Sequence, residues 1–375
     1  MWRVLNDVLD VVVAFVAVSM VLGWVRLAAH RRGPASGDPA VAGLLETAAG
    51  RRVRRCAVAV VDLGAEPVRR TAFVDADAET PFEIGSVTKP LTGLLVADAI
   101  ERGEVSHATT VGDLVPRSGG TELGTVTLGE LVTHRSGLPR IPRGPRFLLR
   151  VLASNYFGTD PYRGLSARRV LDDAAAQRLT GRGVERYSNL GAAVAGQALA
   201  ERAGRSYPAL LRERILSPLG MTSTSAEADA TPARRGYTRW GRRSAAWRLA
   251  GYAPAGGVVS TIDDMAALLE ALLRGTAPGM SALDPLDETG PGGDERAMFW
   301  AIRPARGRGF QSAQERTLRP TTRMGWHNGE TGGFSAFLAI YPNGGRGVVA
   351  LSNVADAKCT QRLAEAVLDA YRVTA

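Results

Sequence analysis

The chain has 375 residues, which is enough for one large domain or two ordinary ones. Hydrophobic residues make up 45% and charged residues 22%, as in ordinary globular proteins, which argues against a disordered chain. The net charge of +9 comes from scattered arginines without a zinc-finger spacing or an aromatic-plus-basic strand, so no nucleic-acid partner is expected.

The first 32 residues differ in composition from the rest. Val11 to Val25 is a run of 15 residues without a charged side chain, and a spanning helix needs about 20 apolar residues. Arg26 and Arg31 follow where a cleavage site needs small residues, so a transmembrane anchor is favoured over a cleaved signal peptide. A buried helix of the main domain is the remaining alternative. The basic C-terminal flank would by itself place the large domain in the cytoplasm.

After a linker at 31–38, a short helix is expected at 40–49 and a buried strand at Cys56–Asp62, with a second strand at 66–75. Helical apolar spacing then predicts helices at 86–102, 127–134, 166–179, 190–204, 207–216 and 261–274. Thr261 or Ser260 can cap the last of these. The end of the chain predicts strands at 299–302, 334–341 and 347–352, then an amphipathic helix at 360–371.

Strands at both ends with helices between them predict an α/β (α+β) domain at 33–375. In it, a terminal helix packs on an antiparallel sheet and a helical subdomain is inserted. The sheet part is expected at about 38–85 and 290–375, and the helical part at about 86–289. A cleft between the two parts is the expected site.

The two cysteines, Cys56 and Cys359, lie at the start of the first predicted strand and after the last one. If those strands are antiparallel neighbours, the thiols can meet in a disulfide, which implies an oxidising compartment. Two buried free thiols are an equally open interpretation.

Several catalytic patterns are absent. The chain has no G-x-S-x-G, no phosphate-binding P-loop and no metal-ligand spacing among its four histidines and two cysteines. Ser86 and Lys89, in FEIGSVTK, are present instead, and only two of the 46 basic residues are lysines. Residues three apart share a helix face, so the Lys89 amine can sit beside the Ser86 hydroxyl and, if burial lowers its pKa, accept the proton.

Two further segments carry polar groups. Tyr187 can relay a proton near Lys89, and Asn189 offers an amide to the substrate, although a helix cap is the simpler interpretation of Ser188 and Asn189. His327 opens a glycine-rich segment, HNGETGG, just before a predicted strand. Glycines there permit close backbone approach to a ligand, and a free N–H can stabilise an oxyanion.

These three segments, in this order, resemble the serine β-lactamase-like and penicillin-binding family. The nearest branches are the class C β-lactamases, the D,D-carboxypeptidases and related esterases. The segments LVTHRSGLP at 131–139 and PAGGVVSTIDDM at 254–265 also resemble this family, and the likeness covers roughly 38–372. It implies the β-lactamase/transpeptidase-like fold and an extracytoplasmic domain, against the orientation that the charges favour.

The resemblance also implies roles for single residues. Ser86 matches the acylated nucleophile, Lys89 the residue that activates it, and Tyr187 the proton shuttle. Substrate-binding residues, by the same likeness, are Asn189, His327, Gly329 and Glu330. The oxyanion would lie between the N–H groups of Ser86 and Glu330, and no cofactor or metal is implied.

One departure bears on the substrate. Many family members carry Lys-Thr-Gly at the third segment, where the lysine attracts a substrate carboxylate, whereas this chain has His327-Asn328-Gly329. The expected function is therefore hydrolysis of a D-amino-acid peptide, an ester or a β-lactam, with a small-molecule or peptide substrate. The alternative is a membrane-anchored protein that binds or senses penicillin or cell-wall peptide with little turnover. The stretch at 140–160, rich in arginine and proline, either shapes substrate access or is a solvated loop.

Overall fold

The computed structural model describes residues 32–49, 53–64, 66–142, 144–230, 232, 235–286, 295–304 and 323–374, with four isolated positions before them. Strands are β1 (Ser36–Gly37), β2 (Cys56–Asp62), β3 (Val68–Val74), β4 (Phe82–Glu83), β5 (Val259–Ser260), β6 (Glu295–Arg296), β7 (Ala301–Pro304), β8 (Arg323–Glu330), β9 (Ser335–Tyr341) and β10 (Arg346–Ser352). The longer helices are α2 (Pro39–Ala48), α3 (Thr88–Glu101), α6 (Pro145–Phe157), α7 (Ala167–Ala175), α8 (Asn189–Arg202), α11 (Ile262–Arg274) and α12 (Ala357–Thr374). Shorter ones are α4 (Val111–Leu114), α5 (Leu128–Val132), α9 (Tyr207–Leu211) and α10 (Ala253–Gly256).

The main sheet is antiparallel throughout, in the order β1-β3-β2-β10-β9-β8-β7-β6. It joins the two ends of the chain, because β2 pairs with β10 along its whole length, from Cys56 opposite Ser352 to Asp62 opposite Arg346. Strands β4 and β5 form a separate small pair. The expected antiparallel sheet, with strands from both ends of the chain, is confirmed.

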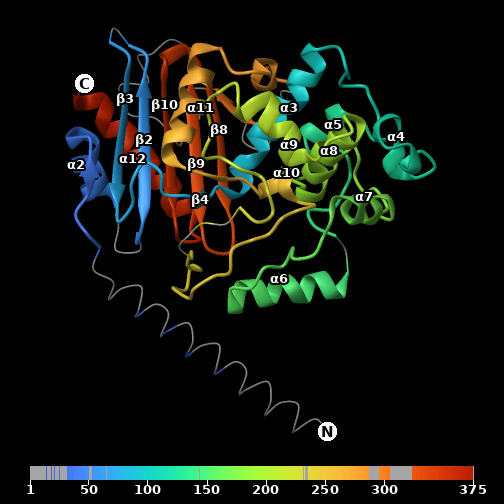
Figure 1. The fold of residues 1–375 in the computed structure, drawn as a ribbon, viewed down its shortest axis with the longest axis horizontal. Coiled ribbons are helices and arrows are strands. Elements are labelled where there is room, and N and C mark those ends of the chain that lie inside the picture. The colour runs from blue at the N-terminus through green and yellow to red at the C-terminus, as the bar shows by residue number, and fades with distance from the viewer. Residues whose placement is uncertain are drawn as a thin grey trace.

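Helices cover both faces of this sheet (Figure 1). Helices α2 and α12 pack on one face, against β3, β9 and β10, and α11 packs on the other, against β2 and β10. Because strand side chains alternate, β2 divides its side chains between two cores. Ala57, Ala59 and Val61 belong to the core shared with the helical part, and Val58 and Val60 to the core under α2 and α12.

Local signals account for several of these elements. Helix α11 begins after Thr261, whose side chain accepts the backbone N–H of Asp264, and it ends at Gly275 in the left-handed conformation. Both ends agree with the predicted helix at 261–274. This helix lies within the range expected for the helical part, yet it packs on the sheet.

Among the elements that the pattern of residues did not predict, α6 and β8 bear on the site. Helix α6 occupies part of the stretch at 140–160. The sequence left this stretch open either as a segment that shapes substrate access or as a solvated loop. Strand β8 contains the third segment, including His327 and Gly329, whereas the pattern placed that segment before a strand. The strand expected after it is β9.

The expected membrane anchor, 11–25 within residues 1–32, lies outside the residues that the structure describes apart from isolated positions. Within the described part of the chain, no helix is both long and apolar enough to cross a bilayer.

Neither Cys56 nor Cys359 is in a disulfide bond, so the disulfide considered from the sequence is not formed. Cys56 is buried on β2 and Cys359 lies partly buried on α12. Burial raises the pKa of Cys56 to about 12, and the nearby Cys359 adds to this effect. Cys56 is therefore an unreactive thiol in the core, in agreement with the second interpretation.

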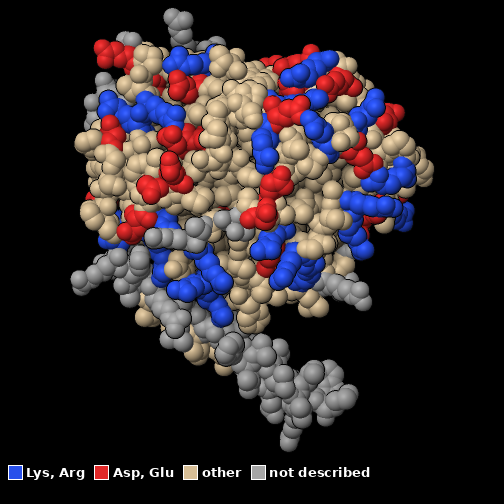
Figure 2. Space-filling model, viewed as in Figure 1, with Lys and Arg blue, Asp and Glu red and all other residues tan. Residues whose placement is uncertain are grey.

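Acidic and basic side chains intermingle on the face shown in Figure 2. Many arginines of the described residues form ion pairs, among them Arg182 with Glu130 and Arg214 with Glu104. The positive charge is therefore distributed among ion pairs on this face instead of forming one basic stripe.

Candidate active site

Ser86 lies in a short 3-10 turn, η1 (Gly85–Val87), directly before α3. This turn is packed between β8 of the sheet and α10 of the helical part. Lys89 is one turn further along, and its Nζ is 3.1 Å from Oγ of Ser86. The two side chains therefore meet as the helical spacing predicted.

Lys89 is fully buried, because almost every side chain of α3 is buried between the two parts of the domain. Burial lowers the pKa of Lys89 well below its usual value, and the positive charge of Arg140 lowers it further. A neutral amine has two N–H groups, and Asn189 Oδ1 at 2.9 Å and Ala255 O at 2.6 Å can accept both. The lone pair of the amine then faces Ser86, where it can accept the hydroxyl proton.

Tyr187 completes the group around the serine. Its hydroxyl hydrogen-bonds to Ser86, and burial raises its pKa to about 12, so the phenol keeps its proton at neutral pH. Nζ of Lys89 lies 4.8 Å from the centre of the ring. A protonated phenol at this position can donate to an atom that leaves the reacting carbonyl.

His134 holds the segment that carries Tyr187. Its carbonyl oxygen accepts the N–H of Arg186 at 2.8 Å, and its Nδ1 accepts the N–H of Ser188 at 3.2 Å. Its ring packs on Tyr187 with the centroids 4.6 Å apart. Burial lowers the pKa of His134 well below its usual value, which keeps Nδ1 free to accept. This geometry gives His134 a structural role, because it holds the backbone on both sides of Tyr187.

Two glycines bring strand β8 against the serine. A Cβ on Gly329 would lie 2.0 Å from the carbonyl oxygen of Ile84, and a Cβ on Gly85 would lie 2.7 Å from the backbone nitrogen of Glu330. Gly85 has φ +52, in the left-handed region that favours glycine. The backbone of Glu330 therefore lies beside the turn that presents Ser86.

His327 lies on β8 with its ring centroid 6.3 Å from that of Tyr187. Its Nδ1 is 2.5 Å from the carbonyl oxygen of Asn328, which makes Nδ1–H the donor. Burial lowers the pKa of His327 to about 3. The third segment therefore presents a neutral imidazole and no cation.

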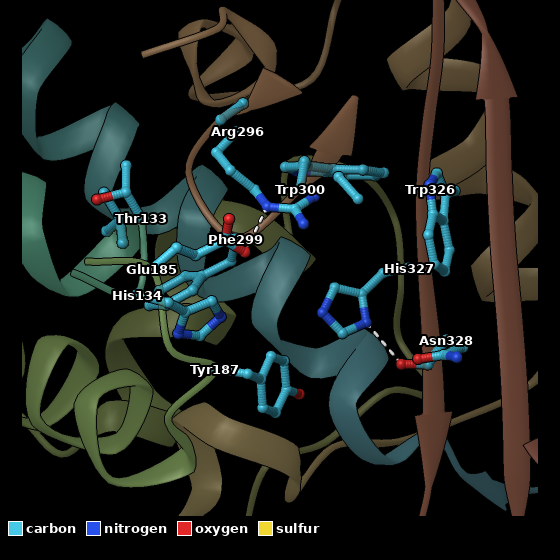
Figure 3. A pocket seen from close by; sticks show the side chains of 13 residues that line it. Thr133, His134, Glu185, Tyr187, Arg296, Phe299, Trp300, Trp326, His327 and Asn328 are labelled. Atoms are coloured by element: carbon cyan, nitrogen blue, oxygen red, sulfur yellow. Dashed lines mark hydrogen bonds and ion pairs between the residues drawn. The ribbon is translucent and has the colours of Figure 1, made fainter. Parts of the chain in front are cut away.

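Two cavities adjoin this group. The Ser86 cavity, of about 840 Å³, is lined by Ser86, Tyr187, Asn189, Gly329 and Glu330 together with residues of α6. A smaller one of about 170 Å³, the Trp300 cavity, lies beside Tyr187 and His327. Figure 3 shows these two side chains at its wall with the ion pair of Glu185 and Arg296, 2.6 Å apart, across from them.

The structure thus gathers Ser86, Tyr187 and Asn189 around Lys89. Strand β8 beside them carries His327, Gly329 and Glu330. No group of three side chains suited to a metal ion occurs among the described residues.

Sequence reasoning missed several neighbours of the site. Tyr162 hydrogen-bonds to Asn189, and burial raises its pKa to about 12. Arg140 and Trp247 line the Ser86 cavity. Arg140 opens the stretch at 140–160, for which a role in substrate access was one of the two open interpretations, and it directly follows the segment LVTHRSGLP. Nothing in the sequence around Tyr162 or Trp247 indicates that they reach the site.

Comparison with known proteins agrees with this geometry. The beta-lactamase family model matches residues 41–372. A beta-lactamase of Escherichia coli K12 is 25% identical over 307 residues, which cover 73% of this chain and 76% of that protein. A D-alanyl-D-alanine-carboxypeptidase/endopeptidase of the same organism is 28% identical over 198 residues, or 50% of this chain and 47% of that one.

Among solved structures, the class C beta lactamase from Rhodobacter sphaeroides superposes with a TM-score of 0.69 at 23% identity, covering 89% of this chain and 99% of that one. This likeness shows the fold: an antiparallel sheet with helices in the β-lactamase/transpeptidase-like arrangement. Since the family model spans most of the chain, the protein belongs to the beta-lactamase family and is an enzyme of the serine hydrolase type.

Proposed function

We propose that the protein hydrolyses a D-amino-acid peptide, an ester or a β-lactam through an acyl-enzyme formed on Ser86. The observation that carries the proposal is the buried Lys89 amine, 3.1 Å from Oγ of Ser86 and with a strongly lowered pKa. A serine hydroxyl is a weak nucleophile until a base takes its proton.

In the acylation step, the Ser86 hydroxyl gives its proton to Nζ of Lys89 as Oγ bonds to the substrate carbonyl carbon. The N–H groups of Ser86 and Glu330 are assigned to stabilise the oxyanion that forms, and the close approach of the Glu330 backbone to Gly85, directly before Ser86, supports this assignment. Tyr187 passes a proton to the leaving group as its bond to the carbonyl carbon breaks. Lys89 then gives the proton that it took from Ser86 to Tyr187, which restores both groups. Water next attacks the acyl carbon and gives a proton through Tyr187 to Lys89, and Oγ takes that proton as its bond to the carbon breaks and the acid is released.

Substrate positioning is assigned to Asn189 and to β8. The side-chain oxygen of Asn189 is engaged by Lys89 at 2.9 Å, and Tyr162 also hydrogen-bonds to this side chain. These two contacts fix the amide for a substrate that enters the Ser86 cavity. His327 contributes a neutral ring from β8.

Intact-mass spectrometry of the full-length chain tests the proposal. A fluorophosphonate and, separately, a penicillin should each add one adduct, which Ser86→Ala should lose while its circular dichroism stays unchanged. Adduct formation that survives in Ser86→Ala contradicts the assignment of the nucleophile.

A second function, binding or sensing without turnover, is favoured by one observation. The third segment offers a neutral His327 where many relatives have a lysine, so a substrate carboxylate is attracted less there. The decay rate of the penicillin adduct separates the two functions. Release within minutes supports a hydrolase, and an adduct stable for hours supports a sensor.

Val11 to Val25 is assigned as the membrane anchor, with the domain outside the cytoplasm. The apolar character of this run supports a membrane segment, Arg26 and Arg31 after it favour an anchor over a cleaved signal peptide, and the family resemblance supports the orientation. The chain should remain in the membrane pellet after alkaline carbonate extraction. Release into the supernatant would contradict the anchor, and protection of the domain from external protease in spheroplasts would contradict the orientation.

A further inference from the structure

The Ser86 cavity contains an arginine without an acidic partner. Arg140 lines this cavity, and its Cζ lies 5.5 Å from the centre of the Tyr187 ring. No carboxylate of the described residues lies within ion-pair distance of it, although many other arginines of the chain are paired. The guanidinium is therefore available to a ligand.

The position of Arg140 is fixed relative to the reacting groups. Its carbonyl oxygen accepts the N–H groups of Asn189 at 3.0 Å and Leu190 at 3.3 Å, at the start of α8. Its charge reaches the buried groups of the site: it adds to the lowering of the Lys89 pKa that burial causes, and it opposes the rise that burial causes in the pKa of Tyr187. A ligand anion near Arg140 thus lies close to the proposed nucleophile.

Other charges at the cavity wall add to this preference for anions. Arg239 also lines the cavity. Among the described residues that line the cavity, Glu330 is the one acidic residue. Its carboxylate accepts the N–H of Ala357 at 2.9 Å. The wall therefore carries an excess of positive charge, which attracts anionic compounds.

One wall of the same cavity is apolar. Helix α6 is anchored by Phe147, which is 8% exposed and packs on Tyr162 with ring centroids 5.6 Å apart. Leu152 and Tyr156 from this helix line the cavity, yet they remain 44% and 39% exposed. Residues four apart share a helix face, so these two form one apolar surface that a ligand can cover.

We propose that the substrate is an amphiphilic anion: an acyl compound with an anionic group that Arg140 binds and an apolar group that lies against Leu152 and Tyr156 of α6. The inference rests on the proposed function, since the reacting carbonyl must lie at Ser86. The neutral His327 agrees with it, because the anion is then recognised at Arg140 and not at the third segment.

Four alkyl fluorophosphonates test this inference on the full-length chain. They pair a short or a long alkyl chain with a terminal carboxylate or a terminal carboxamide. In each reaction Oγ of Ser86 bonds to phosphorus, fluoride leaves and the hydroxyl proton passes to Lys89, so the labelling rate reports recognition without any need for turnover. The rate constants are measured by intact mass.

The carboxylate probes should label wild-type protein at least about tenfold faster than the carboxamides, as a charge-assisted hydrogen bond implies. Arg140→Gln should bring this ratio close to one, whereas Arg178→Gln, which removes an arginine outside the cavity lining, should leave it unchanged. Any effect of Arg140 on Lys89 changes both probes equally and cancels in the ratio.

The long probes should label faster than the short ones, and Leu152→Asn should reduce that preference about fivefold through lost apolar contact. Leu149→Asn, on the same helix but outside the cavity lining, is the matched control. Equal rates for carboxylate and carboxamide, or a ratio unchanged in Arg140→Gln, overturn the inference and leave Ser86 as nucleophile. Absence of labelling by all four probes refutes the nucleophile, and the inference with it.

Discussion

Glu83 carries a carboxyl group whose ionisation should destabilise the fold. It is 3% exposed on β4, three residues before Ser86. The N–H of Trp247 donates to one oxygen at 3.0 Å, and the side chain of Thr331 also hydrogen-bonds to this carboxyl group. Burial raises the pKa of Glu83 from 4.5 to about 7.

The sign and size of the effect follow from this shift. A carboxyl group whose pKa is raised on folding binds its proton more tightly in the folded state, so the free energy of unfolding decreases as the pH rises from about 4.5 through 7. At about 1.4 kcal/mol for each pKa unit, the loss is about 3 kcal/mol by pH 8.

Glu83→Gln removes this ionisation and keeps an oxygen for the N–H of Trp247. Urea unfolding at pH 5 and pH 8 gives the difference in free energy of unfolding between variant and wild type. From pH 5 to pH 8, the free energy of unfolding of the variant should increase relative to that of wild type by about 3 kcal/mol. Glu66→Gln, at an exposed position, should show no such change. A difference that is the same at both pH values for Glu83→Gln would refute the reasoning.

Three further substitutions test the site. Lys89→Arg replaces the amine with a guanidinium that stays protonated at neutral pH and cannot accept a proton, so fluorophosphonate labelling of Ser86 should slow by about 100-fold or more; an unchanged rate would exclude Lys89 as the base. Tyr187→Phe should lower ester or peptide turnover by about 100-fold and slow labelling less, because fluoride leaves without a proton; equal losses would contradict a role in leaving-group protonation. Gly329→Ala places a Cβ 2.0 Å from the carbonyl oxygen of Ile84, so β8 must shift and labelling should be lost; labelling at the wild-type rate would show that the position of β8 does not matter.

Much of the fold was predictable because its signals are local. The strand Cys56–Asp62 is a continuous apolar run, and it is buried on both faces as such runs usually are. Thr261 caps α11 through a hydrogen bond three residues away, which the sequence shows directly. Ser86 and Lys89 were predicted to meet because one helical turn joins them.

The missed elements depend on contacts that are distant in the sequence. Glycines weaken the strand pattern of β8, yet Gly329 is required there because the carbonyl of Ile84 leaves no room for a side chain. Helix α6 leaves Leu152 and Tyr156 partly exposed at the cavity, so its apolar spacing does not describe a core-facing helix. Tyr162 reaches Asn189 only through the tertiary fold.

The central claim is that Ser86 is the residue acylated. Trypsin does not cleave between Lys89 and Pro90, so Ser86 lies in one peptide, residues 71–102, in which it is the only serine. Tandem mass spectrometry of protein labelled with fluorophosphonate or penicillin should place the adduct on Ser86 in this peptide. An adduct on any other residue, or an unmodified 71–102 peptide in fully labelled protein, would contradict the account.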